Sequence, residues 1–579
     1  MKDANALITE LKEKLTRIGD PEILEDCTDS KEYAQSRLVF NRKFEFRPSL
    51  IVYIESTDQV KAIICFANDH PTEIILRFRS GGHDHEGECS GTNTVLLDFS
   101  KLSGIVIEEA QVFEPTKEVY KKLTVGPGAR FNKIKPVMDA AGVGIPHGTC
   151  QTVAIGGFTF GGGWGPWTRL HGMACESLIG ATIVLGNGEC HKLWYTDDPE
   201  SQKGRLLWAL RGGGGMSYGV VTELVFKTFE LPDVSFSFNI KFNQPYSLPF
   251  QEGNKIKMEA PIEMKAVEVV KLWEKAIAPH AFPNLIGTNL KVETAHLEAG
   301  DRPDPNAFLK CQINGYFGGT EIELRSFIEE ILGPKALKSL TLKQDRITEV
   351  NGEVRNFSPA YDWHFESWDR KVINEEQNDE KGMNEIKLDP DGPAPHKITS
   401  RFVDAICEHR TDNWSDASRE ALICSLQSNK IPVTKDAEMK HGLHTYITLG
   451  AISGKFYSDY LEGEEAIGSA FPYKKRPFTI QYQAWWNQFL DLDEKYCLTD
   501  EQVEKEMLIN RPFVNRAQDW IEASRDYTIP HTSGAFISFK DSSIPTSTYF
   551  STSYDALIDV KVKCSKDPNL LFRTRKTIL

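Results

Sequence analysis

Residues 79–91, RSGGHDHEGECSG, gather side chains that bind metals or act as nucleophiles within thirteen positions. His83, His85 and Cys89 are all of types that zinc accepts as ligands. A short His-x-His followed by one cysteine is not a standard zinc spacing, however, and the chain has no His-Glu-x-x-His motif. The four glycines of the segment indicate backbone that adopts positive φ or approaches another surface closely. This segment alone leaves both a metal site and a cofactor cradle open.

Two further glycine-rich runs, residues 142–165 and 206–227, contain neither common nucleotide-binding motif. They lack the Gly-x-Gly-x-x-Gly spacing of a Rossmann site and the Gly-x-x-x-x-Gly-Lys-Ser/Thr of a P-loop. Several separate loops can instead hold a large nucleotide-like ligand, because backbone amides coordinate a pyrophosphate without basic side chains. The alternative is that these glycines only form tight turns.

The length, net charge and hydropathy of the whole chain limit the kinds of molecule that it can bind. Its 579 residues predict two domains, or one large domain with an insertion. The formal net charge of −15 argues against binding nucleic acid, which needs a basic surface. No membrane partner is expected, since the chain has no apolar run long enough to span a bilayer. The charged, helical N-terminus does not resemble a secretory signal, so a cytoplasmic location is expected. A monomer or homodimer is also expected.

Strand and helix patterns alternate from residue 48 to about residue 229, which indicates an α+β or α/β region. Ser56 and Gln59 form a predicted capping box, and a further helix is predicted near 131–141. Longer segments of alternating apolar and polar residues follow and predict an antiparallel sheet with one face covered by helices. These segments are 234–242, 309–319, 444–456 and 478–486. The acidic stretch 374–395, rich in Pro and Gly, predicts a surface excursion.

Four motifs in chain order resemble those of the berberine bridge enzyme-like flavoproteins of the vanillyl-alcohol oxidase/p-cresol methylhydroxylase class. They are RSGGHDHEG, GTCQTVAIGGFTFGGGWG, LHGMACESLIGATIVLGNGE and LLWALRGGGGMSYGVVTELVFK, and residues 549–572 are similar to the family's C-terminal segment. The resemblance implies an α+β fold: a two-part FAD-binding domain of the p-cresol methylhydroxylase type with an inserted substrate domain on an antiparallel sheet covered by helices. The implied divisions are a helical lead-in at 1–45, the FAD-binding domain at 46–229, the substrate domain at 230–505 and a returning C-terminal segment at 506–579.

The resemblance also implies that FAD is held by two covalent bonds. In this family the histidine after Arg-Ser-Gly-Gly, here His83, is joined to the flavin 8α-carbon, and many members add a thioether to C6 from a cysteine matched here by Cys150. Imidazole and thiolate are nucleophiles that add to an electron-poor flavin. The alternative for Cys150 is a small core residue, and no metal is expected. The other residues implied to surround the cofactor are Arg79, Ser80, Gly81, Gly82, Asp84, Gly148, Thr149, Val153, Gly156, Gly157, Gly161, Gly162, Trp164, Gly165, Gly213, Gly214 and Val220.

The resemblance leaves the proton acceptor open. Residues 534–541, GAFISFKD, resemble the family's returning C-terminal strand, which commonly carries a catalytic tyrosine where this chain has Phe539. A second family tyrosine is matched by Trp164. The remaining candidates are His85 and His171, which exchange protons near neutral pH, and Gln481 of the predicted substrate-domain strand. For His85 the alternative is a hydrogen bond within its own loop. The pair Trp485-Trp486 is interpreted as core rather than as a substrate platform.

The expected function is that of an FAD-dependent oxidase. Val153 matches a family gate residue, and a small valine there resembles members that admit O2 to the reduced flavin. A small-molecule substrate, an alcohol or hemiacetal carbon of a sugar or secondary metabolite, would give hydride to flavin N5, and O2 would reoxidise the flavin. The missing tyrosines favour an alternative within the fold: oxidative cyclisation, C–C bond formation or desaturation. A third possibility is a non-enzymatic protein of the same fold, which the retained attachment residues disfavour.

Overall fold

The computed structural model describes most of the chain. The described residues are 4–26, 30–115, 117–244, 250–252, 255–257, 261–279, 281–344, 346–350, 353–357, 394–405, 414–431, 443–458, 468–486 and 500–579. The predicted surface excursion at 374–395 lies outside them, except for its last two residues. Among the described residues, no helix combines the length and the apolar character needed to cross a membrane.

A first sheet carries the strand that leads into residues 79–91. Its order is β1-β2-β4-β3, in which β2, β4 and β3 are parallel and β1 is antiparallel to β2. The strands are β1 Ile23–Glu25, β2 Leu50–Tyr53, β3 Leu76–Arg79 and β4 Val95–Asp98. Helices α1 (Ala4–Thr16) and α3 (Thr57–Asp69) share its core, and α3 begins at the predicted capping box of Ser56 and Gln59. The lead-in therefore contributes a strand to this sheet as well as α1 and α2 (Lys31–Ser36).

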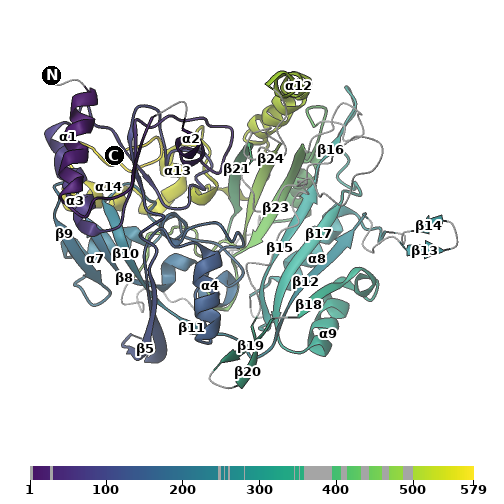
Figure 1. Ribbon diagram of the computed structural model, residues 1–579. Coiled ribbons are helices and arrows are strands. Elements are labelled where there is room, and N and C mark those ends of the chain that lie inside the picture. Colours follow the sequence, from purple (N-terminus) through teal and green to yellow (C-terminus); the bar gives the residue numbers. More distant parts are fainter. Residues whose placement is uncertain are drawn as a thin grey trace.

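A second sheet, entirely antiparallel, supports the two later glycine-rich runs. Its order is β5-β6-β10-β8-β9. The strands are β5 Ile105–Phe113, β6 Glu118–Val125, β8 Leu178–Val184, β9 Cys190–Trp194 and β10 Val220–Lys227. Its core includes side chains of α4 (Phe131–Ala140), α5 (Ile155–Phe160), α7 (Gln202–Leu210) and α14 (Tyr554–Cys564). The C-terminal segment therefore packs on this sheet through α14, and both chain ends lie in the same half of the molecule (Figure 1).

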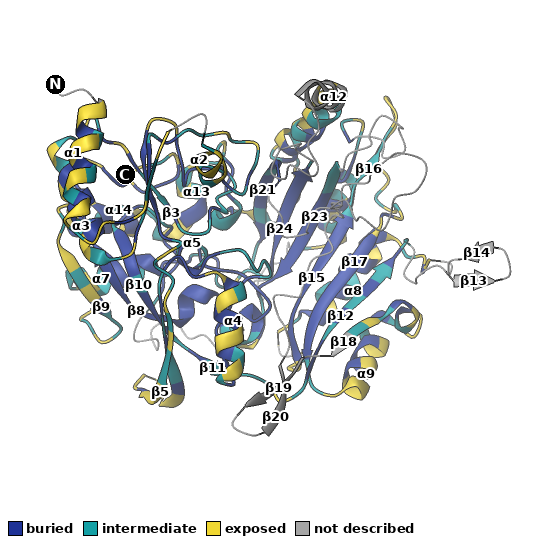
Figure 2. Ribbon diagram, in the orientation of Figure 1, coloured by how far each residue is buried: buried dark blue, intermediate teal, exposed yellow. Residues whose placement is uncertain are grey.

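The third and largest sheet has eight strands and confirms the predicted antiparallel sheet. Its order is β18-β12-β17-β15-β23-β24-β21-β25, and every pair in it is antiparallel. The strands are β12 Ser235–Phe242, β15 Leu285–Glu293, β17 Cys311–Gly318, β18 Thr341–Gln344, β21 His396–Val403, β23 His444–Ala451, β24 Phe478–Trp485 and β25 Thr532–Ser533. One face packs on α8 (Ala266–Ala276), α9 (Glu321–Leu332), α10 (Asp416–Ser425) and α12 (Asp500–Ser524), as predicted. Its strands are largely buried (Figure 2).

Period-two alternation along β24 separates the two faces of this sheet. Ile480, Tyr482 and Ala484 belong to the helix-covered core, whereas Gln481 and Gln483 point to the opposite face. Successive strand residues alternate sides, so a polar residue at every second position marks the face turned away from the core. That face lines the cavity described below.

Shorter elements complete the fold. They are β7 Val143–Gly144, α6 Thr168–His171, η1 Ala174–Ser177, β11 Phe229–Glu230, β13 Phe250–Glu252, β14 Lys255–Lys257, β16 Ala295–His296, η2 Ala336–Ser339, β19 Arg346–Val350, β20 Glu353–Phe357, β22 Gln427–Ser428, α11 Lys455–Ser458, η6 Ile537–Phe539, α13 Thr546–Phe550 and η7 Ser551–Ser553.

The returning C-terminal segment differs from the strand that the resemblance implied at residues 534–541. Only Thr532 and Ser533 pair with β21, and the chain then turns at Gly534, whose φ is +69°. Ile537–Phe539 form a 3₁₀ turn instead of a strand. The implied division between 505 and 506 falls inside α12, so one helix joins both segments.

Candidate cofactor and substrate site

A cavity of about 360 Å³ lies where the three sheets face one another. Loops from the first two sheets line one side, and strands β21, β23 and β24 with the C-terminal segment line the other. The structure brings most of the predicted site residues to it. Those that line it are Ser80, Gly81, Gly82, His83, Asp84, His85, Gly148, Thr149, Cys150, Val153, Gly157, Gly161, Trp164, Gly214, Val220 and Gln481.

The other predicted residues lie outside the lining, namely Arg79, Gly156, Gly162, Gly165, Gly213 and His171. Arg79 is buried at the end of β3, where its Nε donates to Asp98 Oδ2 at 2.5 Å. Gly165 shapes the loop beside the cavity, since a Cβ there would lie 1.8 Å from the His147 carbonyl oxygen.

His171 is also placed away from the cavity. Its ring stacks on Phe229, with ring centroids 3.6 Å apart and planes at 3°. Burial lowers the pKa of His171 to about 3, so the ring is neutral in the interior. A residue that cannot reach the cavity cannot take a proton from a ligand there, which argues against the predicted role of His171.

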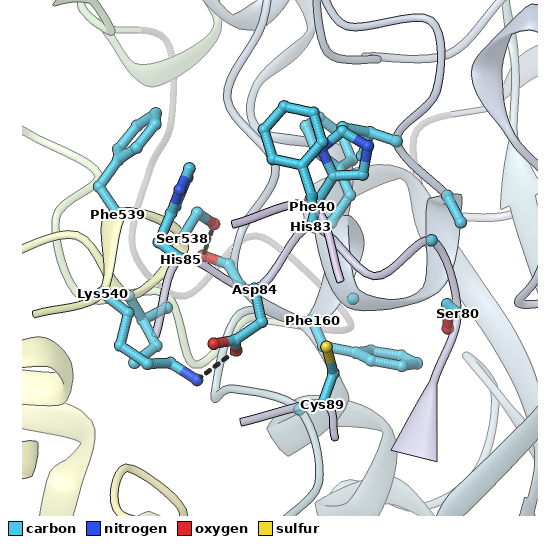
Figure 3. Close-up of a pocket in the computed structure, with 18 of the residues that line it drawn as sticks. Phe40, Ser80, His83, Asp84, His85, Cys89, Phe160, Ser538, Phe539 and Lys540 are labelled. Carbon is cyan, nitrogen blue, oxygen red and sulfur yellow. Dashed lines mark hydrogen bonds and ion pairs between the residues drawn. The ribbon is translucent and has the colours of Figure 1, made fainter. Parts of the chain in front are cut away.

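His83 follows β3 and presents a neutral imidazole at the cavity. Burial, with smaller effects from His85 and Arg130, lowers the pKa of His83 to about 3. Its ring stacks on Phe40 with centroids 3.8 Å apart (Figure 3). Nε2 lies 3.0 Å from Thr152 Oγ1, whereas Nδ1 makes no hydrogen bond within the described chain. The protein therefore holds Nε2 of His83 by a hydrogen bond, and Nδ1 remains available to a ligand in the cavity.

The loop of Cys150 lies directly against the loop of His83. Gly81 allows this approach, because a Cβ there would be 2.7 Å from the backbone nitrogen of Ala154. The Val153 carbonyl accepts from Phe131 N at 3.0 Å, which ties the Cys150 loop to the start of α4. The two residues expected to bind the flavin thus belong to adjoining loops of one cavity.

The glycines at the cavity leave room of the kind a flat aromatic ligand needs. A Cβ at Gly157 would meet no atom within 4 Å, and one at Gly215 would first meet Phe160 at 3.7 Å. Both residues line the cavity, so their missing side chains add to its free space rather than to the packing of the protein. With two nucleophilic side chains at the wall, the residues present fit a flavin.

A buried ion pair lies in the cavity wall. Lys540 Nζ donates to Asp84 Oδ2 at 2.7 Å (Figure 3). It also donates to Glu88 Oε2 at 3.0 Å. Burial opposes the charged amine, but the two carboxylates outweigh it and raise the pKa of Lys540. Sequence reasoning missed Lys540, because Asp84 is 456 positions away and no local pattern links them.

The wall on the large sheet is neutral and rich in hydrogen-bonding groups. Gln483 Oε1 accepts from Tyr446 Oη at 3.1 Å and from Trp485 Nε1 at 3.0 Å, and its Nε2 donates to Thr448 Oγ1 at 3.1 Å. Gln481 Nε2 donates to Thr479 Oγ1 at 2.9 Å. Trp485 packs on Tyr446 in a hydrophobic cluster and also lines the cavity. It therefore belongs to the core, as interpreted from the sequence, and to the cavity wall.

His85 meets a histidine that sequence reasoning did not identify. His85 Nδ1 lies 2.7 Å from Nε2 of His396, the first residue of β21. This contact replaces the hydrogen bond within its own loop that was the alternative for His85. Burial lowers the pKa of His85 to about 4, while the nearby Asp84 carboxylate opposes the shift. In the described ranges, no group of three His, Cys, Asp or Glu side chains is placed to hold a metal ion.

Comparisons with known proteins bear on the cofactor. The family described as "FAD binding domain" matches residues 48–193. Berberine bridge enzyme-like 19 from Arabidopsis thaliana is 23% identical over 544 residues, 93% of this chain and 80% of that protein. Glucooligosaccharide oxidase from Sarocladium strictum is 28% identical over 215 residues, 37% of this chain and 40% of that protein.

The fold is shared with a solved structure over the whole chain. That structure concerns the 6-S-cysteinyl, 8α-N1-histidyl FAD in glucooligosaccharide oxidase from Acremonium strictum. It is 17% identical, has a TM-score of 0.64, and the match covers 100% of this chain and 99% of that one. The matched FAD-binding region, the relatives over nearly the full length and the shared fold agree with the cavity residues. The chain is similar over nearly its full length to berberine bridge enzyme-like FAD-linked oxidoreductases, and its residues 48–193 match the FAD binding domain.

Proposed function

We propose that the protein is an oxidase with bicovalently attached FAD that acts on a C–H beside a hydroxyl group, in a sugar or a similarly hydroxylated metabolite. The observation that carries the proposal is the composition of the cavity. It joins the loops of His83 and Cys150 to a wall of neutral amide, hydroxyl and aromatic side chains. Bound FAD would supply hydride acceptance at N5 and return of the electrons to O2.

The contacts of His83 support its attachment through Nδ1. Thr152 occupies Nε2, and the low pKa leaves a lone pair on the neutral ring. In the Acremonium strictum glucooligosaccharide oxidase, the FAD is 8α-N1-histidyl and 6-S-cysteinyl. Each attachment would exchange a flavin C–H and a protein N–H or S–H for one bond. The two protons and two electrons that each attachment releases would go to O2, giving hydrogen peroxide.

The neutral wall favours an uncharged, hydroxyl-rich substrate. Its described cavity-lining members on β21, β23 and β24 are Ile398, Tyr446, Thr448, Gln481, Gln483 and Trp485, and none is charged. Amide and hydroxyl groups pair with sugar hydroxyls as donors and as acceptors, and an aromatic ring packs on a sugar's apolar face. An ionic substrate would be desolvated on this side without a counter-charge. Gln481 serves to orient the substrate, because a neutral amide does not take up a proton.

His85 is the proton acceptor that the geometry favours. It lines the cavity and is neutral above about pH 4, whereas His171 lies elsewhere. The ring of Phe539 stacks beside it, with centroids 5.6 Å apart, where the family commonly has a phenol. The absence of that phenol favours a second candidate function, oxidative cyclisation or desaturation of a secondary metabolite by the same site.

Intact mass measurement tests the attachment. The wild-type chain is expected to exceed its apo mass by one FAD, as are His83→Ala and Cys150→Ala, whereas the double variant loses the mass and releases FAD in acid. Cys89→Ala is the matched control. Cys89 lines the same cavity, but burial raises the pKa of its thiol to about 12, so it is not a thiolate. If the His83/Cys89 double variant releases FAD and the His83/Cys150 one does not, the thioether is wrongly assigned.

Oxygen consumption tests the reaction. A panel of oligosaccharides, simple alcohols and aromatic metabolites would be compared under identical conditions, with hydrogen peroxide measured in parallel. The proposal expects turnover with at least one carbohydrate. Turnover restricted to an aromatic metabolite, with ring closure in the product, would favour the second candidate. A chain that carries FAD and consumes no oxygen with any of them would contradict both oxidase proposals.

A further inference from the structure

Two histidines 311 positions apart form a hydrogen-bonded pair at the edge of the cavity. His85 Nδ1 lies 2.7 Å from His396 Nε2, and the ring centroids are 4.9 Å apart at 79°. Only one of the two facing nitrogens can carry the shared hydrogen when both rings are neutral. The direction of this hydrogen bond therefore decides whether the other ring nitrogen of His85, Nε2, carries a hydrogen.

The other nitrogen of His396 settles that direction. His396 Nδ1 lies 2.8 Å from the carbonyl oxygen of Ala394, and a carbonyl only accepts. Nδ1 therefore carries the hydrogen, and the Nε2 of a neutral His396 is a lone pair. His396 is 1% exposed and its ring lies against Trp485 at 3.9 Å, where a charge would be poorly solvated. His85 Nδ1–H is then the donor, and His85 Nε2 carries no hydrogen.

Asn41 holds the backbone of both histidines in place. Its Nδ2 donates to the His85 carbonyl at 2.6 Å and to the His396 carbonyl at 3.1 Å, and its Oδ1 accepts from His396 N at 3.1 Å. Asn41 is 1% exposed, so water does not compete for these bonds. The loop after β3 and the start of β21 are thereby fixed to one side chain, which limits the relative movement of the two rings.

We propose that His396 is a positioning residue that fixes the tautomer of His85, so that His85 offers an unprotonated Nε2 to the substrate as the proton acceptor. The inference rests on the proposed oxidase function and deepens it. In the oxidation, the hydroxyl proton would move to His85 Nε2 as the C–O bond becomes a carbonyl, and FAD bound in the cavity would supply the acceptor for the C–H hydride and both of its electrons.

The pair also stabilises the product of this proton transfer. Once His85 is positively charged, its Nδ1–H still points at the His396 lone pair, and charge-assisted hydrogen bonds are stronger than neutral ones. The charged groups nearest to His85 oppose each other, because Asp84 favours the imidazolium and Lys540 disfavours it. Within the part of the chain that the structure describes, Nδ1 is the only ring atom of His85 in a hydrogen bond, so Nε2 remains for the substrate.

Nitrogen NMR of protein with ¹⁵N-labelled histidine rings tests the tautomer without any turnover. At pH 7 the spectrum is expected to contain the signal of a histidine that carries hydrogen on Nδ1 and none on Nε2. This signal should disappear in His85→Asn. The tautomer of His85 should change in His396→Phe, which keeps a ring but removes the acceptor. A His85 signal with hydrogen on Nε2 in the wild-type protein, or one unaffected by His396→Phe, would overturn the proposal.

Anaerobic flavin reduction in a stopped-flow instrument, with cellobiose as the probe, tests the consequence. We expect His85→Asn to slow reduction about 10²- to 10⁴-fold and His396→Phe about 10- to 100-fold. His396→Gln should recover most of the rate, because its Oε1 can accept from His85 Nδ1–H. The matched control is His296→Phe. His296 also contacts a carbonyl through Nδ1, that of Ile431, but lies outside the cavity.

The outcomes separate this inference from the proposed function. Flavin content, measured by absorbance per chain, should equal the wild-type value in all four variants. If cellobiose and the wider panel fail to reduce the wild-type protein, the oxidase function is contradicted, and the NMR result still decides the tautomer. If the wild type is reduced and His396→Phe matches it in rate, His396 does not position the base and the inference fails alone.

Discussion

His83 Nε2 lies 3.0 Å from Thr152 Oγ1, so a side-chain hydrogen bond joins the loop after β3 to the loop of Cys150. It connects His83 to the loop that carries Cys150, the second residue proposed to bind the flavin. It also orients the imidazole, because a ring held at Nε2 by Thr152 and stacked on Phe40 has its Nδ1 direction determined.

Removal of this hydrogen bond should impair attachment at His83. In a Cys150→Ala background, where His83 provides the only proposed bond, Thr152→Val is expected to lower the fraction of chains that carry covalent FAD. Intact mass measures that fraction. Thr294→Val is the control, since Thr294 bonds to Thr445 away from the cavity. An unchanged covalent fraction in the Thr152 variant would show that the bond does not orient His83.

Two glycines in the same region should respond in opposite ways. Gly157→Ala meets no protein atom within 4 Å and lies in α5, so the apo chain should be unchanged or up to about 1 kcal/mol more stable, while FAD binding weakens. Gly81→Ala would place a Cβ 2.7 Å from Ala154 N and should destabilise even the apo chain by about 1–3 kcal/mol. Both glycine changes would be made in the His83/Cys150 double variant. Thermal unfolding would then measure the stability of the apo chain, and titration with FAD would measure its affinity for the cofactor. Normal FAD affinity of Gly157→Ala would place the ligand elsewhere.

The buried cluster around Lys540 should contribute to stability at neutral pH. Lys540→Met leaves Asp84 without its cation and Glu88 with Arg575 alone, and breaking a buried pair in this way costs about 3–5 kcal/mol. Lys563→Met removes an exposed pair with Asp559 and should change nothing measurable. Denaturant unfolding measures the free energy of unfolding of both variants and of the wild type.

The same cluster sets a pH dependence of stability. Burial alone would raise the pKa of Asp84, but the ion pair with Lys540 and a hydrogen bond from the Glu88 backbone outweigh it and lower that pKa. A lowered carboxyl pKa stabilises the fold above the unfolded value of about 3.9, and this stability is lost as the pH falls through the folded pKa. The wild-type advantage over Lys540→Met should therefore be complete at pH 6 and shrink below about pH 4.

The pH dependence of flavin reduction should identify the proton acceptor. Because the pKa of His85 is lowered to about 4, the reduction rate is expected to be constant between pH 8 and 5 and to fall below about pH 4 as His85 becomes protonated. Circular dichroism at each pH would verify that the chain stays folded, and His85→Asn should remove the step. A rate that instead rises steadily toward pH 10 would indicate a tyrosinate as the base.

Much of the site could be predicted from local sequence. The capping box of Ser56 and Gln59 and the alternating residues of β24 were correctly predicted, because each depends on backbone geometry within a few positions. The glycines that line the cavity were recognised by their density. A strand at 534–541 was expected and not found, since the turn at Gly534 ends the pairing with β21 after two residues.

By itself, the sequence determined the antiparallel sheet and the glycine-rich loops, because residue type and spacing specify backbone conformation locally. Its resemblance to a known family, rather than local spacing, pointed to His83 and Cys150 as the proposed attachment residues. Only the tertiary structure decided what these residues face. It stacked Phe40 on His83 and placed His396 against His85. It kept His171 out of the cavity, and it brought Lys540 to Asp84 across 456 positions. Contacts of that range arise from the packing of three sheets around one cavity, and no periodicity or short motif encodes them.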